Sequence, residues 1–416
     1  MSSNKRKFQP KEEDKPPHKI QKMRDSDACE DSTNECEGRK SIDSSENLGT
    51  DILEACEKGD VDLVKKLVEE GISVHELDRK GNSCFLIACK YGNLDLVHYL
   101  LLNGSSVHEK NYMLDTGLLL ASFEGHLEIV KYLLDIGCSI NAVNLKEYTS
   151  LLNAVHNGHL DVIKYLLNNG STLQERDNDL GYTPLLLAVS KSHINIVKFL
   201  LSKGSSTSEK DFSGYTSLLL ASQMGNLEIV KCLLDNGSAL NERTKDGNTS
   251  LLLASGEGHL ELVKFFLKNG NRIDERQSNG FTSLLLASLH GHLDVVKYLL
   301  ENGSSINEKS NIGSTCILLA SRGGHLELIK YLVNEKGCSL QDIGIHGTCI
   351  MSAARYRRIN CVLWMLSNGS SLDECKRLNY FGKIITCHSC EHILKDSNIY
   401  QEIKTIHETK ALKTKK

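Results

Sequence analysis

The chain has 416 residues, of which 40% are hydrophobic and 25% charged, and its formal net charge is only −4. No apolar run reaches the roughly 18–20 residues needed to span a bilayer, and the first residues are charged, so we expect neither a transmembrane segment nor a signal peptide. Several of the fourteen cysteines occupy apolar positions, where a free thiol packs as a small hydrophobe, and this favours a reducing compartment. We expect a cytoplasmic or nuclear protein, or one found in both.

Residues 1–50 form a basic and then acidic tail that we expect to be disordered. Residues 1–24 contain eight Lys and Arg residues and three acidic residues. Residues 25–51 contain nine acidic residues, one Lys and one Arg. A segment this charged and this poor in aromatics cannot bury enough apolar surface to fold. Two interpretations of its separated basic clusters stay open, a bipartite nuclear-import signal and a solvated basic tail. The residues concerned are Lys5, Arg6, Lys7, Lys19, Lys22 and Arg24.

Residues 51–376 repeat one pattern at a nearly fixed interval. Ten glycines mark the period, with spacings of 32 to 34 residues: Gly71, Gly104, Gly137, Gly170, Gly204, Gly237, Gly270, Gly303, Gly337 and Gly369. A period between 20 and 50 residues indicates a solenoid, in which each unit buries its apolar surface against its neighbours.

The unit "TSLLLASLHGHLDVVKYLLENG" at 282–303 predicts two short helices. Thr282 can cap the first, and a Gly-His pair breaks the chain before the second. In the second, Leu293, Val296, Leu299 and Leu300 fall on one helical face. We expect Gly303 to end that helix in a left-handed conformation. A polar hairpin then leads to the next unit.

These motifs resemble the ankyrin-repeat family over residues 51–376. Thr183-Pro184-Leu185 keeps the family's Thr-Pro-Leu, and Gly125–Leu134 closely matches its second-helix pattern. The family's His in the first motif is replaced here by Leu, at Leu186, Leu219, Leu252 and Leu285. The resemblance implies an all-α ankyrin solenoid of about ten helix-turn-helix units, of which the first and last are atypical.

The resemblance also implies a non-enzymatic scaffold or adaptor that binds a partner protein through hairpin tips and the concave face of the first helices. We expect a monomer with no cofactor and no membrane association. Exposed aromatic and apolar side chains are the anchors that interfaces favour. The candidates are Tyr91, Tyr112, Phe123, Tyr148, Tyr182, Phe212, Tyr215, Met224, Phe281 and Leu289.

Two alternative functions stay open. One is a nuclear regulator of nucleic-acid processes, whose basic tails contact phosphates. The other is a substrate-recognition subunit of a ubiquitin ligase, which would dock to the ligase through the C-terminal segment. The sequence contains no phosphate-binding loop, no H-E-x-x-H and no nucleophile elbow, so we do not expect an enzyme.

Two groups of residues invite a metal interpretation. One histidine recurs per unit, at His126, His159, His193, His259, His292 and His325. Successive units lie about one helix diameter apart, so these rings cannot share an ion, and we expect a structural role. Cys387 and Cys390 form half of a zinc motif without a second half, so we expect ordinary residues, with metal binding as the alternative.

The C-terminal residues 377–416 predict a degenerate cap and a basic tail. When the repeat period is continued past residue 376, Ile384-Ile385 align with Leu285-Leu286, which belong to the first helix of their unit. This alignment predicts an eleventh, incomplete unit.

Overall fold

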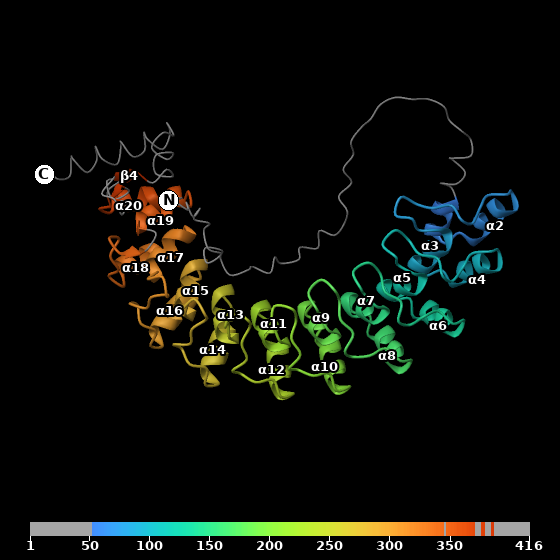
Figure 1. Cartoon of the computed structure of the whole chain (residues 1–416), viewed down its shortest axis with the longest axis horizontal. Coiled ribbons are helices and arrows are strands. Elements are labelled where there is room, and N and C mark those ends of the chain that lie inside the picture. Colours follow the sequence, from blue (N-terminus) through green and yellow to red (C-terminus); the bar gives the residue numbers. More distant parts are fainter. Residues whose placement is uncertain (1–51, 345–346, 371–375, 379–383, 387–416) are drawn as a thin grey trace, which may run out of the picture. The chain divides into compact units, whose positions relative to one another are not determined.

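The computed structural model describes residues 52–344, 347–370, 376–378 and 384–386. Over these residues the chain forms ten stacked helix pairs, which we number as repeats 1–10 (Figure 1). The first helices are residues 52–58, α3 (Cys84–Tyr91), α5 (Gly117–Glu124), α7 (Ser150–Asn157), α9 (Pro184–Ser190), α11 (Ser217–Met224), α13 (Ser250–Glu257), α15 (Ser283–His290), α17 (Cys316–Gly323) and α19 (Cys349–Arg355).

The second helices follow after a short break in each repeat. They are α2 (Val61–Glu69), α4 (Leu94–Leu102), α6 (Leu127–Asp135), α8 (Leu160–Asn168), α10 (Ile194–Ser202), α12 (Leu227–Asp235), α14 (Leu260–Lys268), α16 (Leu293–Glu301), α18 (Leu326–Asn334) and α20 (Ile359–Ser367). None of the helices in the described part of the chain has the length and apolar character needed to cross a membrane.

The predicted threonine caps are confirmed. In six repeats a Thr in extended backbone accepts a hydrogen bond from the N–H three residues ahead, which satisfies one of the free donors at the helix start. These are Thr116, Thr149, Thr183, Thr216, Thr249 and Thr282, and Ser83 does the same in repeat 2.

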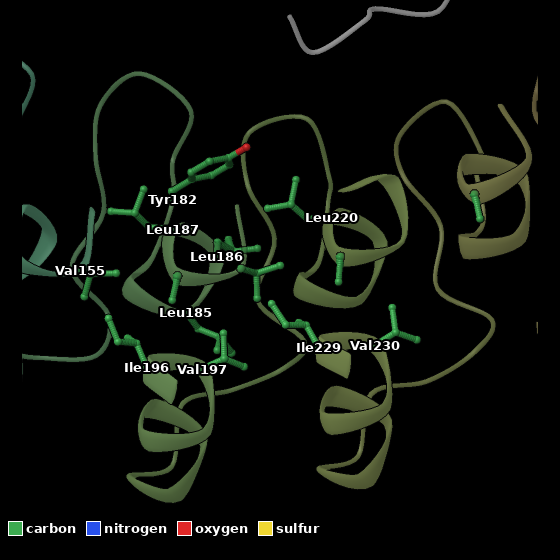
Figure 2. Close-up of a cluster of buried hydrophobic side chains, with 14 of the residues drawn as sticks. Val155, Tyr182, Leu185, Leu186, Leu187, Ile196, Val197, Leu220, Ile229 and Val230 are labelled. Carbon is green, nitrogen blue, oxygen red and sulfur yellow. The ribbon is translucent and has the colours of Figure 1, made fainter. Parts of the chain in front are cut away.

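The core runs without interruption from one repeat to the next. In α16, Val296 and Leu299 of the predicted stripe are fully buried, and Leu293 and Leu300 are half-buried. Figure 2 shows the same arrangement in repeats 5 and 6, with side chains of α9 and α10 near those of α12. Each interface between repeats therefore buries apolar surface that a single helix pair would leave exposed.

The hairpin loops join one repeat to the next and lie on the side of the first helices (Figure 1). Backbone hydrogen bonds connect successive tips: Phe212 donates its N–H to the carbonyl of Leu180, and Ser278 donates to that of Asp246, each at 2.9 Å. Gly303 follows α16 with φ of +105°, as predicted. The first-helix row and the linked tips together present one surface to solvent.

The C-terminal end differs from the prediction. Strand β4 (Ile384–Thr386) pairs antiparallel with β3 (Lys376–Leu378), so the expected first helix at Ile384-Ile385 is wrong. Two β-branched isoleucines followed by a threonine favour extended backbone over a helix. A second two-stranded pair, β1 (Ile343–Gly344) with β2 (Gly347–Thr348), precedes α19.

Candidate partner-binding surface

Five of the ten predicted partner-binding side chains are exposed. Tyr112 and Phe212 lie at hairpin tips and are 67% and 53% exposed. Tyr91, Phe123 and Met224 lie at the ends of α3, α5 and α11, where they extend the same surface onto the first helices.

Three others are buried, so the expectation that they lie on an exposed rim is wrong. Tyr182, Tyr215 and Phe281 stand at the base of their hairpins, immediately before the capping threonine. The carbonyl of Tyr215 accepts a hydrogen bond from the N–H of Asp211 and closes the turn, and the ring packs inward. Burial accordingly raises the pKa of Tyr215 to about 12.

The remaining two are half-buried. Leu289 packs against the core at the end of α15, so the expectation that it is an exposed anchor is wrong. Tyr148 also packs against the core, and burial raises the pKa of its hydroxyl. One edge of the Tyr148 ring nevertheless takes part in an aromatic cluster on the first-helix side.

That cluster is centred on His156, which the sequence analysis did not select. The ring of Phe123 stacks on it at a centroid distance of 5.9 Å, and Tyr148 meets it edge-on at 6.2 Å. Burial lowers the pKa of His156, which favours the neutral ring in the folded protein. Asn157 donates to the carbonyl of Phe123 at 2.6 Å and fixes the end of α5. The cluster therefore offers preorganised aromatic surface.

Hairpin tips add apolar residues that the sequence analysis missed. Met113 and Leu114 follow Tyr112 and are 43% and 41% exposed, while Leu145 at the next tip is 57% exposed. The signal was present in the sequence, since "NYMLD" puts three large apolar residues in a row where other tips carry Gly and polar residues.

Three lysines lie beside these apolar residues, among exposed acids that include Glu124 and Glu147. Lys90 lies over the Tyr91 ring, 5.1 Å from its centroid, and Lys110 and Lys146 are exposed beside the tips. Two of the acids in this region are already hydrogen-bonded within the protein. Glu109 accepts from the Ser83 hydroxyl, and Asp115 accepts from Asn144 at 2.9 Å.

The repeated histidines have a structural role. The Nε2 atom of each ring lies within hydrogen-bond distance of a first-helix carbonyl in the preceding repeat, for example His126 with Lys90 at 2.8 Å and His325 with Leu289 at 2.9 Å. Asn93 and Arg358 make the equivalent bond at the two ends of the series. No group of three or more His, Cys, Asp or Glu within the described segments is arranged to hold a metal ion.

A family model for ankyrin repeats matches residues 52–144, 118–211, 218–310 and 306–374. The chain is an ankyrin-repeat protein. Ankyrin repeats are in general protein–protein interaction modules, and the family is typically non-enzymatic. A search of curated proteins finds no match to this ankyrin-repeat protein.

Some predictions fall on parts of this ankyrin-repeat protein that lie outside the described residues. They concern the basic clusters at Lys5, Arg6, Lys7, Lys19, Lys22 and Arg24, and the pair Cys387 and Cys390.

Proposed function

We propose that this protein is a non-enzymatic scaffold or adaptor that binds a partner protein through one surface of repeats 2–6. We call this surface the apolar face. It consists of Tyr91, Phe123 and Met224 on first helices and of Tyr112, Met113, Leu114, Leu145 and Phe212 on hairpin tips.

The observation that carries the proposal is the uneven distribution of exposed apolar side chains along a regular scaffold. The tip of repeat 3 carries three of them, whereas the tips of repeats 7 and 8 carry residues such as Lys245, Asp246 and Asn279 at corresponding positions. Polar residues suffice to build this hairpin. Exposed Tyr, Met, Leu and Phe side chains at the tips are therefore not needed to form the hairpin, and they favour a surface that a partner protein covers.

The shape of the apolar face suits a protein segment better than a small molecule. Its members come from repeats 2, 3, 4 and 6, and the linked tips hold them in a row. Aromatic and Met side chains contribute much contact area per residue, and the lysines beside them set specificity for a partner with acidic groups.

Capture of the partner from a native cell extract tests the proposal. The full chain is compared with a variant that carries Ser in place of Tyr112, Phe123, Phe212 and Met224. The control carries Ser in place of Leu63, Leu102 and Ile136, which are 39%, 87% and 40% exposed on or beside the second helices. We expect the first variant to lose the captured protein and the control to keep it, with unchanged thermal unfolding curves. Equal capture by both variants contradicts the proposal.

A further inference from the structure

A carboxylate links the hairpin loop of one repeat to the helix cap of the repeat before it. Thr249 donates its hydroxyl to Oε2 of Glu275 at 2.6 Å, and Oε1 of Glu275 accepts from the N–H of Arg272 at 3.2 Å. The same two-sided bridge, with the glutamate 26 residues after the cap, recurs in four further pairs. These are Ser83–Glu109, Thr149–Glu175, Thr216–Glu242 and Thr282–Glu308.

The junction between repeats 3 and 4 has the cap hydroxyl and the loop N–H that donate to the carboxylate elsewhere, but it has no carboxylate. The residue 26 positions after Thr116 is Ala142, which is the one non-acidic residue among the eight equivalent positions from Glu109 to Asp342. The Thr116 side chain accepts from the N–H of Leu119 at 3.3 Å, but in the described protein its hydroxyl proton has no acceptor. The N–H of Ser139, which corresponds to that of Arg272, likewise has no acceptor among the described residues.

A pocket of about 280 Å³ occupies this place. Thr116, Ser139 and Ala142 line it, and His108, Lys110 and Cys138 complete most of its wall. Thr116 is only 8% exposed and lines this pocket, as does Lys110, so a hydroxyl proton without an acceptor borders a cavity that also holds a positive charge. A hydroxyl donor without an acceptor forgoes a hydrogen bond, and an incoming carboxylate would supply it.

The next junction, at Thr149, is bridged by Glu175. The junction after it, at Thr183, lacks the bond from the cap hydroxyl within the described part of the chain but keeps an acidic residue at the equivalent position. This residue is Glu209, whose carboxylate lies 4.0 Å from the guanidinium of Arg176. At Thr315 the cap hydroxyl donates to Asp342 at 3.4 Å. The vacant carboxylate position is therefore specific to the junction between repeats 3 and 4.

We propose that this pocket binds a glutamate side chain of the partner protein, at a position next to an apolar residue of the same partner segment. The inference rests on the proposed function and adds the chemistry of the bound segment. Five intramolecular glutamates already show how a carboxylate fits between a cap hydroxyl and a loop N–H in this scaffold. Lys110 adds a positive charge that favours an anion.

The apolar residue that we expect next to the partner's glutamate is inferred from the apolar side chains that follow Ala142. Val143, directly after Ala142, is 39% exposed, and Leu145 beside it donates its N–H to the carbonyl of Met113. An extended segment that places its glutamate on Thr116 consequently sets its next side chains against the exposed tips of repeats 3 and 4. The hairpin that follows Ala142 thus connects the pocket to Leu145 of the apolar face.

The first test asks whether the pocket accepts a carboxylate, and it needs no partner. Ala142→Glu supplies the missing residue, and Ala142→Ser is the matched control that leaves the pocket open. We expect A142E to unfold at a higher temperature than A142S, and we expect Thr116→Val to remove that gain. A lower unfolding temperature for A142E, or a gain that survives T116V, overturns the inference.

The second test uses a library of dodecapeptides, acetylated and amidated at their ends, with Glu or Gln at the central position and random flanks. Selection on the full chain should enrich Glu over Gln, with an apolar residue nearby. A fluorescein-labelled selected peptide should bind A142E about tenfold or more weakly than the unmodified chain, and A142S as well as the unmodified chain.

Selection of no Glu peptides, or equal binding by A142E, overturns the inference. If peptides without Glu bind and the four-serine variant of the apolar face loses them, the proposed function stands and only the glutamate pocket fails. If Glu peptides bind and the four-serine variant keeps both them and the captured protein, the pocket stands and the apolar face fails.

Discussion

The histidine series makes a sharp prediction about two glycines of repeat 8. Gly291 ends α15 with φ of +83°, and a Cβ built on it would overlap the ring of His325 from the next repeat. Gly303 has a similar backbone, with φ of +105°, but a Cβ there meets no atom within 4 Å. Gly291→Ala and Gly303→Ala therefore each place an alanine in a left-handed backbone, at a similar cost in free energy. Only Gly291→Ala also displaces the His325 ring.

The magnitudes follow from these contacts. A left-handed conformation costs an L-residue about 1–2 kcal/mol, and the reduced freedom of the unfolded chain returns about 0.4–1 kcal/mol. We thus expect G303A to lower the free energy of unfolding by about 1 kcal/mol. G291A also forces the His325 ring away from the carbonyl of Leu289, which it meets at 2.9 Å, and this adds about 1–2 kcal/mol.

Urea unfolding followed by circular dichroism measures both variants, alone and together with His325→Ala. In the H325A background the ring is absent, so the cost of G291A should fall to that of G303A. Equal costs for G291A and G303A in the otherwise unmodified chain would refute the reasoning. So would a G291A cost that persists without the histidine.

Three further outcomes are expected. Burial lowers the pKa of three histidines from the ordinary value of 6.5, namely His156, His292 and His325. The unfolded chain therefore binds more protons near and below pH 6.5, and the free energy of unfolding should fall as the pH drops through this range, by at most about 1.4 kcal/mol per pH unit for each extra proton. Urea titrations at pH 7.5, 6.5 and 5.5 check this, and a pH-independent midpoint contradicts it. Thr249→Val should cost about 1–3 kcal/mol in urea unfolding, because it leaves the Glu275 carboxylate without its cap hydroxyl, whereas an unchanged midpoint contradicts a structural bridge. Arg276→Met should cost about 1–2 kcal/mol, since Nη1 donates to the carbonyls of Gly280 and Lys309 at 2.7 and 2.9 Å, and hydrogen exchange at the repeat 8 and 9 hairpins should accelerate.

The repetitive part of the fold was readable from the sequence because its signals are local. The glycine period, the capping threonines and the apolar stripe of the second helix each lie within one unit, and each predicted its element correctly. Ile384-Ile385 lacked a cap and a following stripe, and there the period alone predicted a helix where the structure has a strand.

The surface was harder to predict, because exposure depends on contacts between repeats. Phe212 and Tyr215 are three residues apart in one hairpin, yet the first is exposed at the tip and the second is buried at the base. Composition does not distinguish them, since turn geometry decides which side chain points inward. The Thr249–Glu275 bridge similarly joins residues that are 26 positions apart and that meet only when the two helices between them fold back on each other.

The most direct test of the central claim is hydrogen–deuterium exchange on the full chain, with and without the protein that it captures. We predict slower exchange at the hairpin tips of repeats 3 and 4 and at the ends of α5 and α7, with no change in the exposed ends of α4 and α6 or in the tips of repeats 8 and 9. Protection confined to the second helices, or to the segments outside residues 52–370, would contradict the claim that the apolar face holds the partner.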